Sequence, residues 1–374
     1  MFLQRLKLIQ FKNYLQKEFA FGRGFNCLSG SNGMGKTNVL EAICYLCLTK
    51  SCRGLQDRQL VLHGKDFFRL EGDFGKEDFS EKSEEKLEVV AKVIPGKRKE
   101  ISLNGVPYTR LADHVGCIPL VFIAPDDHLL VMEGGEVRRR FLDLSLSQID
   151  HTYLYELMKY NKLVKQRNYA LKQFAEQKRF DATLIQGYDS QIAPLGDLIF
   201  HKRREFVEEF LPHFLYYHSL ITEGKEEVSC VYRSSLEQAG MAELLREQLD
   251  RDRLLQRTSM GVHRDDLLFS LSGKSLRKFG SQGQIKSFVL ALKLAQYRLL
   301  FEKKKVKPLL LLDDLFDKLD ASRVLNLLQL LSKEPFGQIF ITHTESEALR
   351  ILFAESGIET PVHYCIEPGS VQKL

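Results

Sequence analysis

Short apolar runs separated by polar or glycine-containing segments mark the N-terminal part of the chain. These runs predict one strand from Leu3 to Phe11, a second from Phe19 to Phe21 and a third over Phe25–Leu28. The third leads into a glycine-rich segment, after which Val39–Cys47 carry apolar residues at helical spacing. The pattern therefore predicts a strand, a glycine loop and a helix in succession.

A β-rich segment follows. Residues 77–86 form an acidic run, and strands are predicted at 87–94 and 100–103, with a Pro-Gly pair between them and an Asn-Gly pair after them. The Asn-Gly pair is a hairpin turn signal. We interpret this stretch as an antiparallel β layer with an exposed acidic loop.

A helical pattern occupies the middle of the chain. The apolar run Ile118–Ala124 predicts a buried strand, and apolar residues then recur every three or four positions from Glu136 to about Phe214. Strands and helices alternate again towards the C-terminus, at 261–271, 284–301, 308–312, 322–331 and 338–342. We therefore expect an α/β unit built from residues 1–115 and 256–374 around a helical lobe at 116–255.

Composition narrows the class of protein. The 374 residues suffice for about two or three folding units. Contents of 44% apolar and 28% charged residues are typical of a soluble globular protein. The 54 Lys+Arg and 49 Asp+Glu residues give a net charge of only +5. This balance excludes a polycation that holds DNA by net charge alone, but it allows a local basic stripe.

The seven cysteines favour a reducing compartment, because they are odd in number and scattered. Cys44 and Cys47 form a C-x-x-C pair, but no second pair or nearby histidine completes a zinc set, so core packing is the simpler interpretation. The N-terminus lacks a signal peptide's unbroken apolar stretch, and no run approaches the roughly 18 apolar residues of a membrane helix. We therefore expect a cytoplasmic protein.

The clearest chemical motif is a phosphate-binding pattern of the form Gly-x-x-x-x-Gly-Lys-Ser/Thr. The matching residues are Gly30, Ser31, Asn32, Gly33, Met34, Gly35, Lys36 and Thr37. Glycines let backbone N–H groups point at phosphate oxygens, and a helix N-terminus adds partial positive charge. Lys36 is expected to reach the β and γ phosphates of ATP, and Thr37 to bind Mg²⁺. The alternative, a plain glycine-rich turn, is disfavoured by the strand–helix context.

Two carboxylates follow the predicted strand at 308–312. Asp313 is the natural partner of Mg²⁺ through water, and Asp314 could orient or deprotonate the attacking water. An aspartate pair after an apolar run can also be a strand that ends at the surface. Its combination with a phosphate loop favours the functional interpretation.

A second candidate anion site opens the predicted helix at 284–301. The segment consists of Ser281, Gln282, Gly283 and Gln284. Ser281 offers a hydroxyl there, and Gly283 offers a backbone N–H that no side chain covers. This segment resembles the signature motif of ABC-type ATPase heads, which caps the γ phosphate of ATP held by the opposite subunit. On the same resemblance, Asp320 matches the loop that crosses the dimer interface, and His343 matches the switch residue that contacts the γ phosphate.

Over nearly its whole length the chain resembles the RecF family of bacterial recombination-repair ATPases, which are related to SMC heads. Besides the motifs above, the matching segments are LKLIQFKNY, SCRG, FIAPDDHLLV, GGEVRRRFLDL, KQRN and LLLLDDLFDKLD. Asp317-Lys318 depart from the Ser-Glu of most such chains, and no metal-sensing glutamine ends the strand at 118–124. The implied fold is an α/β P-loop NTPase head of the ABC type, with an antiparallel β layer and an inserted α-helical lobe.

The resemblance also implies a function. An ATP-dependent homodimer would bind single-stranded or gapped DNA, using ATP and Mg²⁺ as cofactors, and would hydrolyse ATP slowly with stimulation by DNA. It would act with RecR, and with RecO through RecR, in loading the RecA recombinase, with effects on DNA replication and on the SOS response to DNA damage. The implied location is the cytoplasm, in association with the nucleoid and without a membrane partner.

Basic clusters in the predicted helical lobe are candidates for DNA contacts. They are Arg138, Arg139, Arg140, Lys165, Arg167, Lys202, Arg203 and Arg204. Such groups would give sequence-independent, salt-sensitive binding to phosphates. A solvated helix face with local ion pairs is an equally good interpretation of any single cluster.

The alternative function is that of the ATPase subunit of an ABC transporter, which shares the nucleotide motifs. The helical lobe, the RecF-like segments outside those motifs and the aspartate at position 314 argue against it. An SMC-like structural arm is excluded because the chain has no long pair of heptad-repeat segments.

Overall fold

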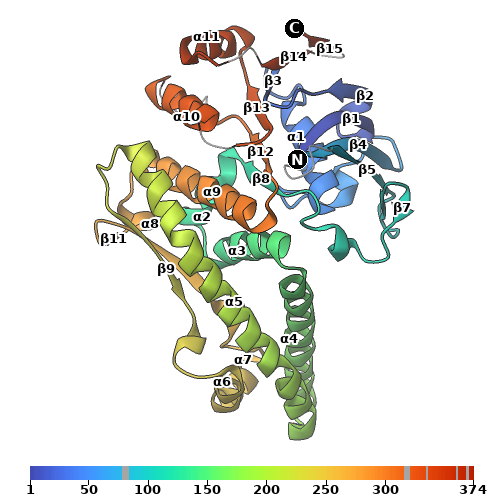
Figure 1. Cartoon of the computed structure of the whole chain (residues 1–374). Helices are drawn as coiled ribbons and strands as arrows, with labels where there is room; N and C mark the ends of the chain where they lie inside the picture. The colour runs from blue at the N-terminus through green and yellow to red at the C-terminus, as the bar shows by residue number, and fades with distance from the viewer. Residues whose placement is uncertain (78–83, 316–320, 334–335, 359–360, 368–369) are drawn as a thin grey trace. The chain divides into compact units, whose positions relative to one another are not determined.

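A computed structural model describes the whole chain except residues 78–83, 316–320, 334–335, 359–360 and 368–369 (Figure 1). The chain divides into two compact units, one made of residues 1–127 and 292–374 and the other of residues 128–291. We call them the α/β unit and the helical unit. These boundaries differ from the expected ones: residues 116–127 lie in the α/β unit, and residues 256–291, with the segment 281–284, lie in the helical unit.

Strands from both ends of the chain form the central sheet of the α/β unit. The sheet has six strands in the order β15-β14-β3-β13-β12-β8, and only β15 is antiparallel to its neighbour. All residues of β12 are buried, as expected of a parallel strand that is covered on both faces. The strands predicted at 25–28, 118–124, 308–312 and 338–342 are confirmed. The strands β15, β14, β3, β13, β12 and β8 span, in this order, Ser370–Lys373, Val362–Glu367, Phe25–Ser29, Ile339–His343, Leu309–Leu312 and Leu120–Ile123.

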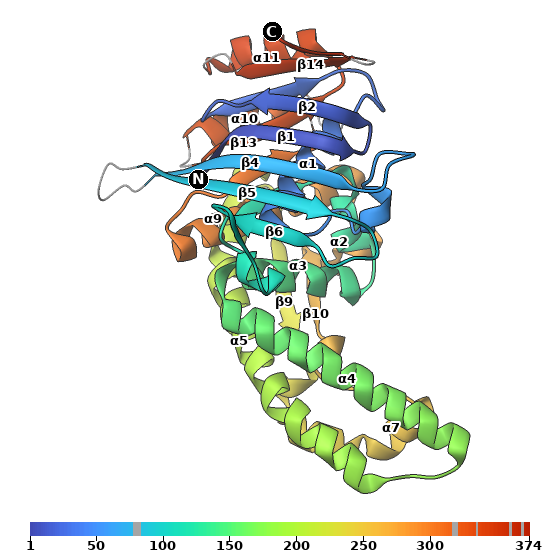
Figure 2. The ribbon, with the colours of Figure 1, turned by 90° about the vertical axis from the view of Figure 1, so that its right-hand side faces the viewer.

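A second, antiparallel sheet confirms the predicted β layer (Figure 2). The hairpin between β6 and β7 turns at Asn104 and Gly105, both with the positive φ angles that a type I′ turn requires. Part of the expected acidic loop is strand, because Glu85 and Lys86 pair with β4; residues 78–83 lie outside the described residues. The order is β2-β1-β4-β5-β6-β7, with bounds Tyr14–Ala20, Phe2–Phe11, Phe68–Glu77, Glu84–Val93, Glu100–Leu103 and Val106–Pro107.

Helix α1, Lys36–Leu48, contacts both sheets. Most of its side chains are therefore buried, on all sides of the helix. A disulfide joins Cys44 of this helix to Cys52, a pair that was not predicted from the sequence. The other helices of the α/β unit are α10, Ala321–Lys333, α11, Ser346–Ser356, and the C-terminal part of α9, Gln282–Lys304.

One buried amide links the two sheets. Gln338, just before β13, accepts a hydrogen bond from the Leu3 N–H at 2.7 Å and donates to the carbonyls of Leu3 and Gly22 at 2.8 and 2.6 Å. Leu3 and Gln338 are at most 1% exposed, so the Leu3 backbone groups depend on this amide for their hydrogen bonds. A polar side chain thus holds the first strand of one sheet against the other.

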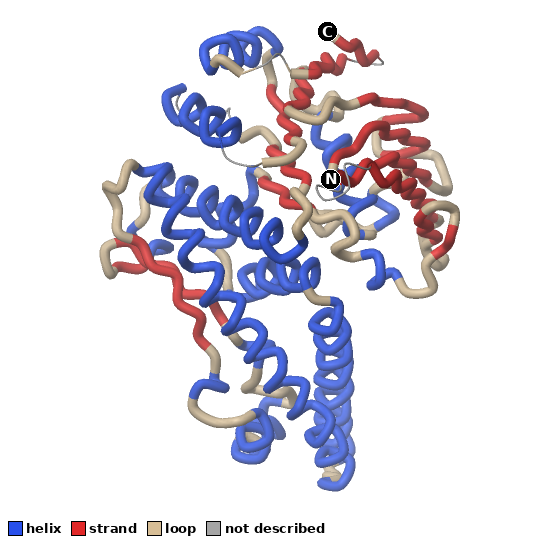
Figure 3. The backbone as a smooth tube through the Cα atoms, in the orientation of Figure 1, coloured by secondary structure: helices blue, strands red, loops and turns tan. Residues whose placement is uncertain are grey.

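The helical unit consists mainly of long helices (Figure 3). Helices α3, Gly135–Ile149, α4, His151–Gln177, and α5, Ala182–Thr222, confirm the helical segment predicted from Glu136. Aspartate side chains cap two of them: Asp150 accepts from the Tyr153 N–H at 3.2 Å, and Asp181 from the Leu184 N–H at 3.0 Å. Of the helices in the described part of the chain, none has the length and apolar composition needed to cross a bilayer.

The remaining elements of the helical unit are short. A three-stranded sheet, in the order β11-β10-β9, includes the strand predicted within 261–271 and adds β9, which was not predicted. Four short helices and the N-terminal part of α9 complete the unit. The strands are Val228–Arg233, Asp266–Leu271 and Lys274–Ser275 for β9 to β11, and α2, α6, α7 and α8 span Leu129–Met132, Met241–Glu247, Leu249–Leu255 and Leu276–Phe279.

Candidate nucleotide site

The predicted phosphate loop connects the end of β3 to the start of α1, as the sequence pattern requires. Gly30 and Gly35 adopt φ angles of 140° and 112°, which other residues rarely take. A Cβ atom would lie 2.1 Å from the Ile366 carbonyl oxygen at Gly30 and 2.5 Å from the Asn13 side chain at Gly35. Both glycines are therefore required by backbone conformation and by space.

The Lys36 ammonium group lies over the loop that precedes it. Its Nζ atom donates to the carbonyl oxygen of Gly30 at 2.6 Å and to that of Ser31 at 3.3 Å. The Lys36 side chain is buried, whereas Ser31, Asn32 and Gly33 are exposed. The loop thus holds a cation at its inner side and presents its outer backbone to solvent, an arrangement suited to an anionic ligand.

The turn between β1 and β2 supports the phosphate loop from another part of the chain. Asn13 donates to the Met34 carbonyl oxygen at 2.8 Å and accepts from the Asn38 amide at 2.8 Å. Tyr14 donates through its hydroxyl to the Gly35 carbonyl oxygen at 3.2 Å. The sequence analysis assigned no role to these two residues, although both lie in the RecF-like segment LKLIQFKNY.

Asp313 is brought to the phosphate loop by the parallel pairing of β12 and β13. Its Oδ1 atom accepts from the Thr37 hydroxyl at 2.8 Å and from the Thr342 hydroxyl at 2.9 Å. Burial raises the pKa of Asp313, and these two hydrogen bonds oppose that shift. Thr37 and Asp313 therefore meet as predicted, and Thr342 is an additional residue that holds the carboxylate.

The donor set suits a magnesium ion. Mg²⁺ prefers oxygen ligands and is usually held by one or two carboxylates together with phosphates of a substrate. The Thr37 hydroxyl and the Asp313 carboxylate are such ligands, and they lie beside a loop whose geometry suits phosphate. These residues therefore fit the metal that the sequence motif implies.

Asp314 directly follows the buried carboxylate and approaches the same Thr342 hydroxyl. Its backbone N–H donates to the Thr342 hydroxyl at 2.8 Å, and that hydroxyl is 3.2 Å from Asp314 Oδ1. The Asp314 φ angle is 43°, in the left-handed region. Thr342 thus orients both aspartates at the end of β12.

His343, at the end of β13, is oriented by its own backbone turn. Its Nδ1 atom accepts from the Glu345 N–H at 2.9 Å. An accepting Nδ1 carries no proton, so the neutral ring has its proton on Nε2 and can donate from there. The neutral His343 ring is therefore the Nε2–H tautomer, which can donate a hydrogen bond from Nε2.

Glu41 lies one turn beyond Thr37 on α1 and is 1% exposed. Burial raises the pKa of its carboxyl group, while the nearby charges of Arg53 and Lys12 lower it. Arg53 belongs to the SCRG segment, and Lys12 belongs to the turn that supports the phosphate loop. This carboxylate was not predicted from the sequence, because nothing in the local pattern marks it as buried beside two cations.

The predicted signature segment forms the N-terminus of α9 in the helical unit. The Ser281 hydroxyl accepts from the Gln284 N–H at 3.3 Å, and the Gln284 side chain accepts from the Ser281 N–H at 2.9 Å. This reciprocal pair is a capping box. The segment is therefore an ordinary helix N-cap, and it leaves Ser281 and Gln282 exposed. Asp320, the predicted dimer-loop residue, lies outside the described residues.

Three arginines that we expected to contact DNA are buried ion-pair partners, and this expectation is corrected. Arg138 bonds Asp266 at 2.6 and 3.0 Å, and Arg167 bonds Asp189 and Asp252 at 2.6 and 2.7 Å. The third, Arg203, and its acidic partner Asp265 are at most 2% exposed in their side chains. Their charges are already neutralised and inaccessible to a phosphate.

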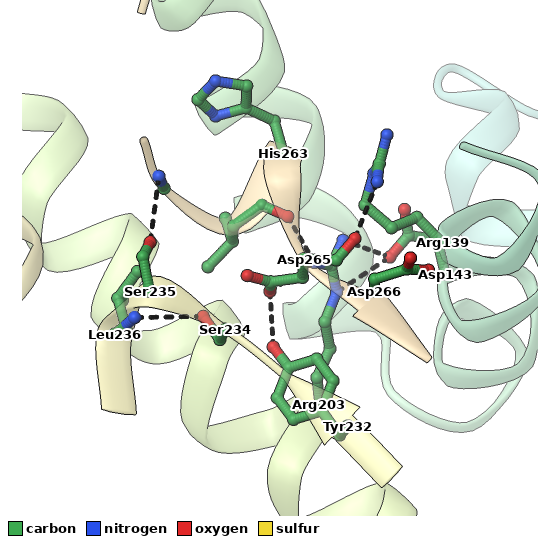
Figure 4. A network of polar contacts seen from close by, with 12 residues as sticks. Arg139, Asp143, Arg203, Tyr232, Ser234, Ser235, Leu236, His263, Asp265 and Asp266 are labelled. Carbon is green, nitrogen blue, oxygen red and sulfur yellow. Dashed lines mark hydrogen bonds and ion pairs between the residues drawn. The ribbon is translucent and has the colours of Figure 1, made fainter. Parts of the chain in front are cut away.

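Arg203 is the centre of this polar network (Figure 4). Its guanidinium donates to Asp265 at 2.9 Å, to Asp143 at 2.8 Å and to the Val262 carbonyl oxygen at 2.7 Å. Asp265 also accepts from the Tyr232 hydroxyl at 2.5 Å, and its carbonyl oxygen accepts from Arg139 at 2.7 Å. The network therefore joins α3, α5, β9 and the turn before β10.

The other predicted DNA contacts lie at or near the surface. Arg140 and Arg204 pair with Glu136 and Glu208 of their own helices, and Lys202 pairs with Asp150 at 3.1 Å. Lys165 is exposed on α4. Exposed pairs of this kind are weak, so these cations stay available as predicted DNA contacts.

Comparisons with known proteins agree with this geometry. Residues 2–360 match the family model described as RecF/RecN/SMC N terminal domain. An Smc head domain from Pyrococcus furiosus superimposes with a TM-score of 0.57 at 16% identity, covering 100% of this chain and 96% of that one. The fold is therefore that of an ABC-type ATPase head of the RecF and SMC class.

Closer relatives identify the family. The DNA replication and repair protein RecF of Flavobacterium johnsoniae is 43% identical over 347 residues, which cover 93% of this chain and 95% of the relative. A structure described as the recombination mediator protein RecF-ATP in the RecFOR pathway has a TM-score of 0.88 at 28% identity, covering 100% of this chain and 97% of that one. The chain belongs to the RecF family.

The Arg203 network predicts a large effect of a single substitution. Arg203→Met keeps side-chain bulk but leaves the buried Asp265 without its cation, so we expect unfolding to become easier by about 3–5 kcal/mol. Denaturant unfolding followed by circular dichroism measures this loss. Arg204→Met, at the exposed neighbour, serves as control and should change stability by less than about 1 kcal/mol. Equal unfolding midpoints for the two variants would contradict the network's role.

A partly buried histidine in the same unit predicts a pH dependence. His263 Nε2 lies 3.0 Å from the Thr258 carbonyl oxygen, and Nδ1 lies 2.8 Å from the Tyr160 hydroxyl, contacts that a neutral ring satisfies. Burial lowers the pKa of His263 to about 4. Between about pH 6.5 and pH 4 the unfolded chain therefore binds a proton that the folded chain does not, and stability should fall as the pH falls.

The difference between wild type and His263→Gln isolates this contribution from the titration of carboxylates. We expect the wild type to lose about 2–3 kcal/mol more than the variant over that window, measured by denaturant unfolding at several pH values. Parallel pH profiles for the two proteins would show that His263 does not titrate in this way.

Proposed function

We propose that this chain is an ATP-dependent DNA-binding protein of recombinational DNA repair and replication. The observation that carries the proposal is the cluster of Thr37, Asp313 and Thr342 beside a phosphate loop with a buried lysine. ATP would bind with its phosphates against the backbone of residues 30–35 and the Lys36 ammonium group. Thr37 and Asp313 would hold Mg²⁺, which supplies positive charge to the phosphates.

Hydrolysis would depend on the two side chains at the ends of β12 and β13. Asp314 would orient or deprotonate the attacking water. His343 would donate a hydrogen bond from Nε2 to a γ-phosphate oxygen. The backbone angle of Asp314 and its bond to Thr342 fix where this carboxylate can reach. We propose slow turnover, suited to a switch.

The signature segment would complete the site in a homodimer. Ser281 and Gln282 are exposed at a helix N-terminus, which can bind the γ phosphate of a nucleotide held by a second copy. Gly283, Gln284 and Asp320 would contribute to the same interface. The similar RecF structure is that of a recombination mediator protein of the RecFOR pathway. We propose RecR as a partner of this chain, RecO through RecR, and roles in RecA loading and the SOS response.

A basic cavity in the α/β unit is the surface that we propose for DNA. Its volume is about 1080 Å³, and its lining includes Lys50, Arg58, Lys65 and Lys99. The lining also includes two acidic residues, Asp66 and Asp57, the latter paired with Lys99 at 3.0 Å, so four positive residues face two negative ones. Exposed cations around a concave surface suit the phosphate backbone of a nucleic acid.

Nucleotide-dependent assembly tests the proposal. Wild type should become dimeric with ATP and retain gapped DNA more strongly, because closure adds protein–phosphate contacts. Lys36→Ala should lose at least tenfold in ATP affinity and lose the ATP effect on DNA, while Ser281→Arg should bind ATP but stay monomeric. Light scattering and fluorescence anisotropy measure these effects, with Lys274→Ala as an exposed control. A wild type that stays monomeric with ATP would contradict the proposal.

The cavity gives a separate test. Arg58→Glu with Lys65→Glu reverses two exposed charges without touching the phosphate loop, so ATP affinity should stay unchanged while DNA affinity falls at least tenfold. The loss should be similar for different DNA sequences, and the dependence of binding on salt should become weaker. Lys202→Glu with Arg204→Glu, in the helical unit, compares the cavity with the predicted helical contacts. Undiminished DNA binding by the cavity variant would assign DNA to another surface.

A further inference from the structure

The connection between α4 and α5 carries a groove that the proposed function does not use. Helix α4 ends at Gln177, α5 begins at Ala182, and α7 lies beside both (Figure 2). A cavity of about 510 Å³ lies among these segments within the helical unit. It is lined by Leu171, Phe174, Ala175, Lys178, Arg179, Phe180, Asp250, Arg253 and Leu254.

The floor of this groove is apolar and continuous with the core. Leu171 is 2% exposed and belongs to a buried cluster with Ala170 and Ile185. The rings of Phe174 and Phe180 pack edge to face with their centres 5.6 Å apart. Leu254 on α7, by contrast, is 84% exposed. The groove therefore combines an apolar floor with an exposed apolar side chain at its edge.

The rim of the groove is positively charged. Lys178 ends α4 in a left-handed conformation with φ 49°, and the Arg179 N–H donates to the Phe174 carbonyl oxygen at 3.1 Å. This turn fixes both residues at the groove. Arg253 lies 4.2 Å from the centre of the Phe180 ring and bonds Asp250 at 3.2 Å. Because Asp250 offsets Arg253, the groove has an excess of two positive charges from Lys178 and Arg179.

We propose that this groove binds an acidic polypeptide segment that inserts a large apolar side chain, supplied by a partner protein. Carboxylates of the segment would face Lys178 and Arg179, and its apolar side chain would cover Phe174, Phe180 and Leu254. A nucleic-acid backbone has no apolar group to fill the hollow, and two cations offer little of the charge that DNA binding uses. The groove shares no lining residue with the candidate nucleotide site.

A peptide of alternating glutamate and leucine, labelled with fluorescein, is the probe for the experiment. Fluorescence anisotropy should show saturable binding to the full chain, and Arg179→Glu and Leu254→Ser should each weaken it at least tenfold. Both substitutions are at exposed positions, and thermal unfolding should confirm that the variants keep wild-type stability. Lys225→Glu, near the opposite end of α5, makes the same charge change away from the groove and should bind as wild type.

Two altered peptides and one competitor decide between occupants. Peptides of alternating lysine and leucine, or of glutamate and serine, should bind at least tenfold more weakly, because each lacks one of the two required chemistries. Gapped DNA should not displace the probe, and Lys36→Ala should bind it normally even if the nucleotide proposal fails. Absence of binding, equal binding of the lysine peptide, displacement by DNA, or wild-type affinity in both groove variants would overturn the inference.

Discussion

The hydrogen bonds that Asp313 accepts from Thr37 and Thr342 join the end of β12 to helix α1 and to strand β13. They form only if β3, β12 and β13 lie parallel in one sheet, with their carboxyl ends at the same edge. Gln338 then attaches the first strand of the chain to this sheet, and the β1–β2 turn supports the phosphate loop through Asn13. The candidate nucleotide site therefore forms only when the N-terminal and C-terminal parts of the chain fold together into the α/β unit.

The helical unit is organised by a different interaction, the pairing of buried charges. Arg167 and Arg203 each bond two aspartates from other segments, and each loses most of its hydration. Such pairs contribute little net stability relative to apolar packing, but a partner removed or displaced leaves an uncompensated charge. They therefore favour one arrangement of the long helices over alternatives that apolar side chains alone would tolerate.

Features that depend on local backbone geometry could be predicted from the sequence, whereas features that depend on contacts between distant segments could not. Glycine spacing predicted the phosphate loop because Gly30 and Gly35 respond to local backbone demands. The roles of Asn13, Thr342 and Glu41 depend on contacts between distant segments, which no local pattern encodes. The arginines are an intermediate case: Arg167 follows Tyr160 and Val164 on the buried face of α4, so helical periodicity could have indicated its burial.

The left-handed backbone of Asp314 has a consequence for the residue that can stand there. Among residues other than glycine, asparagine and aspartate accept this conformation most readily, since their short polar side chains bond to the nearby backbone. A glutamate at the same position would have to place a longer side chain on the same unfavourable backbone angle. The left-handed backbone angle of Asp314 and the hydrogen bond from its N–H to Thr342 together fix where its short side chain lies at the end of β12.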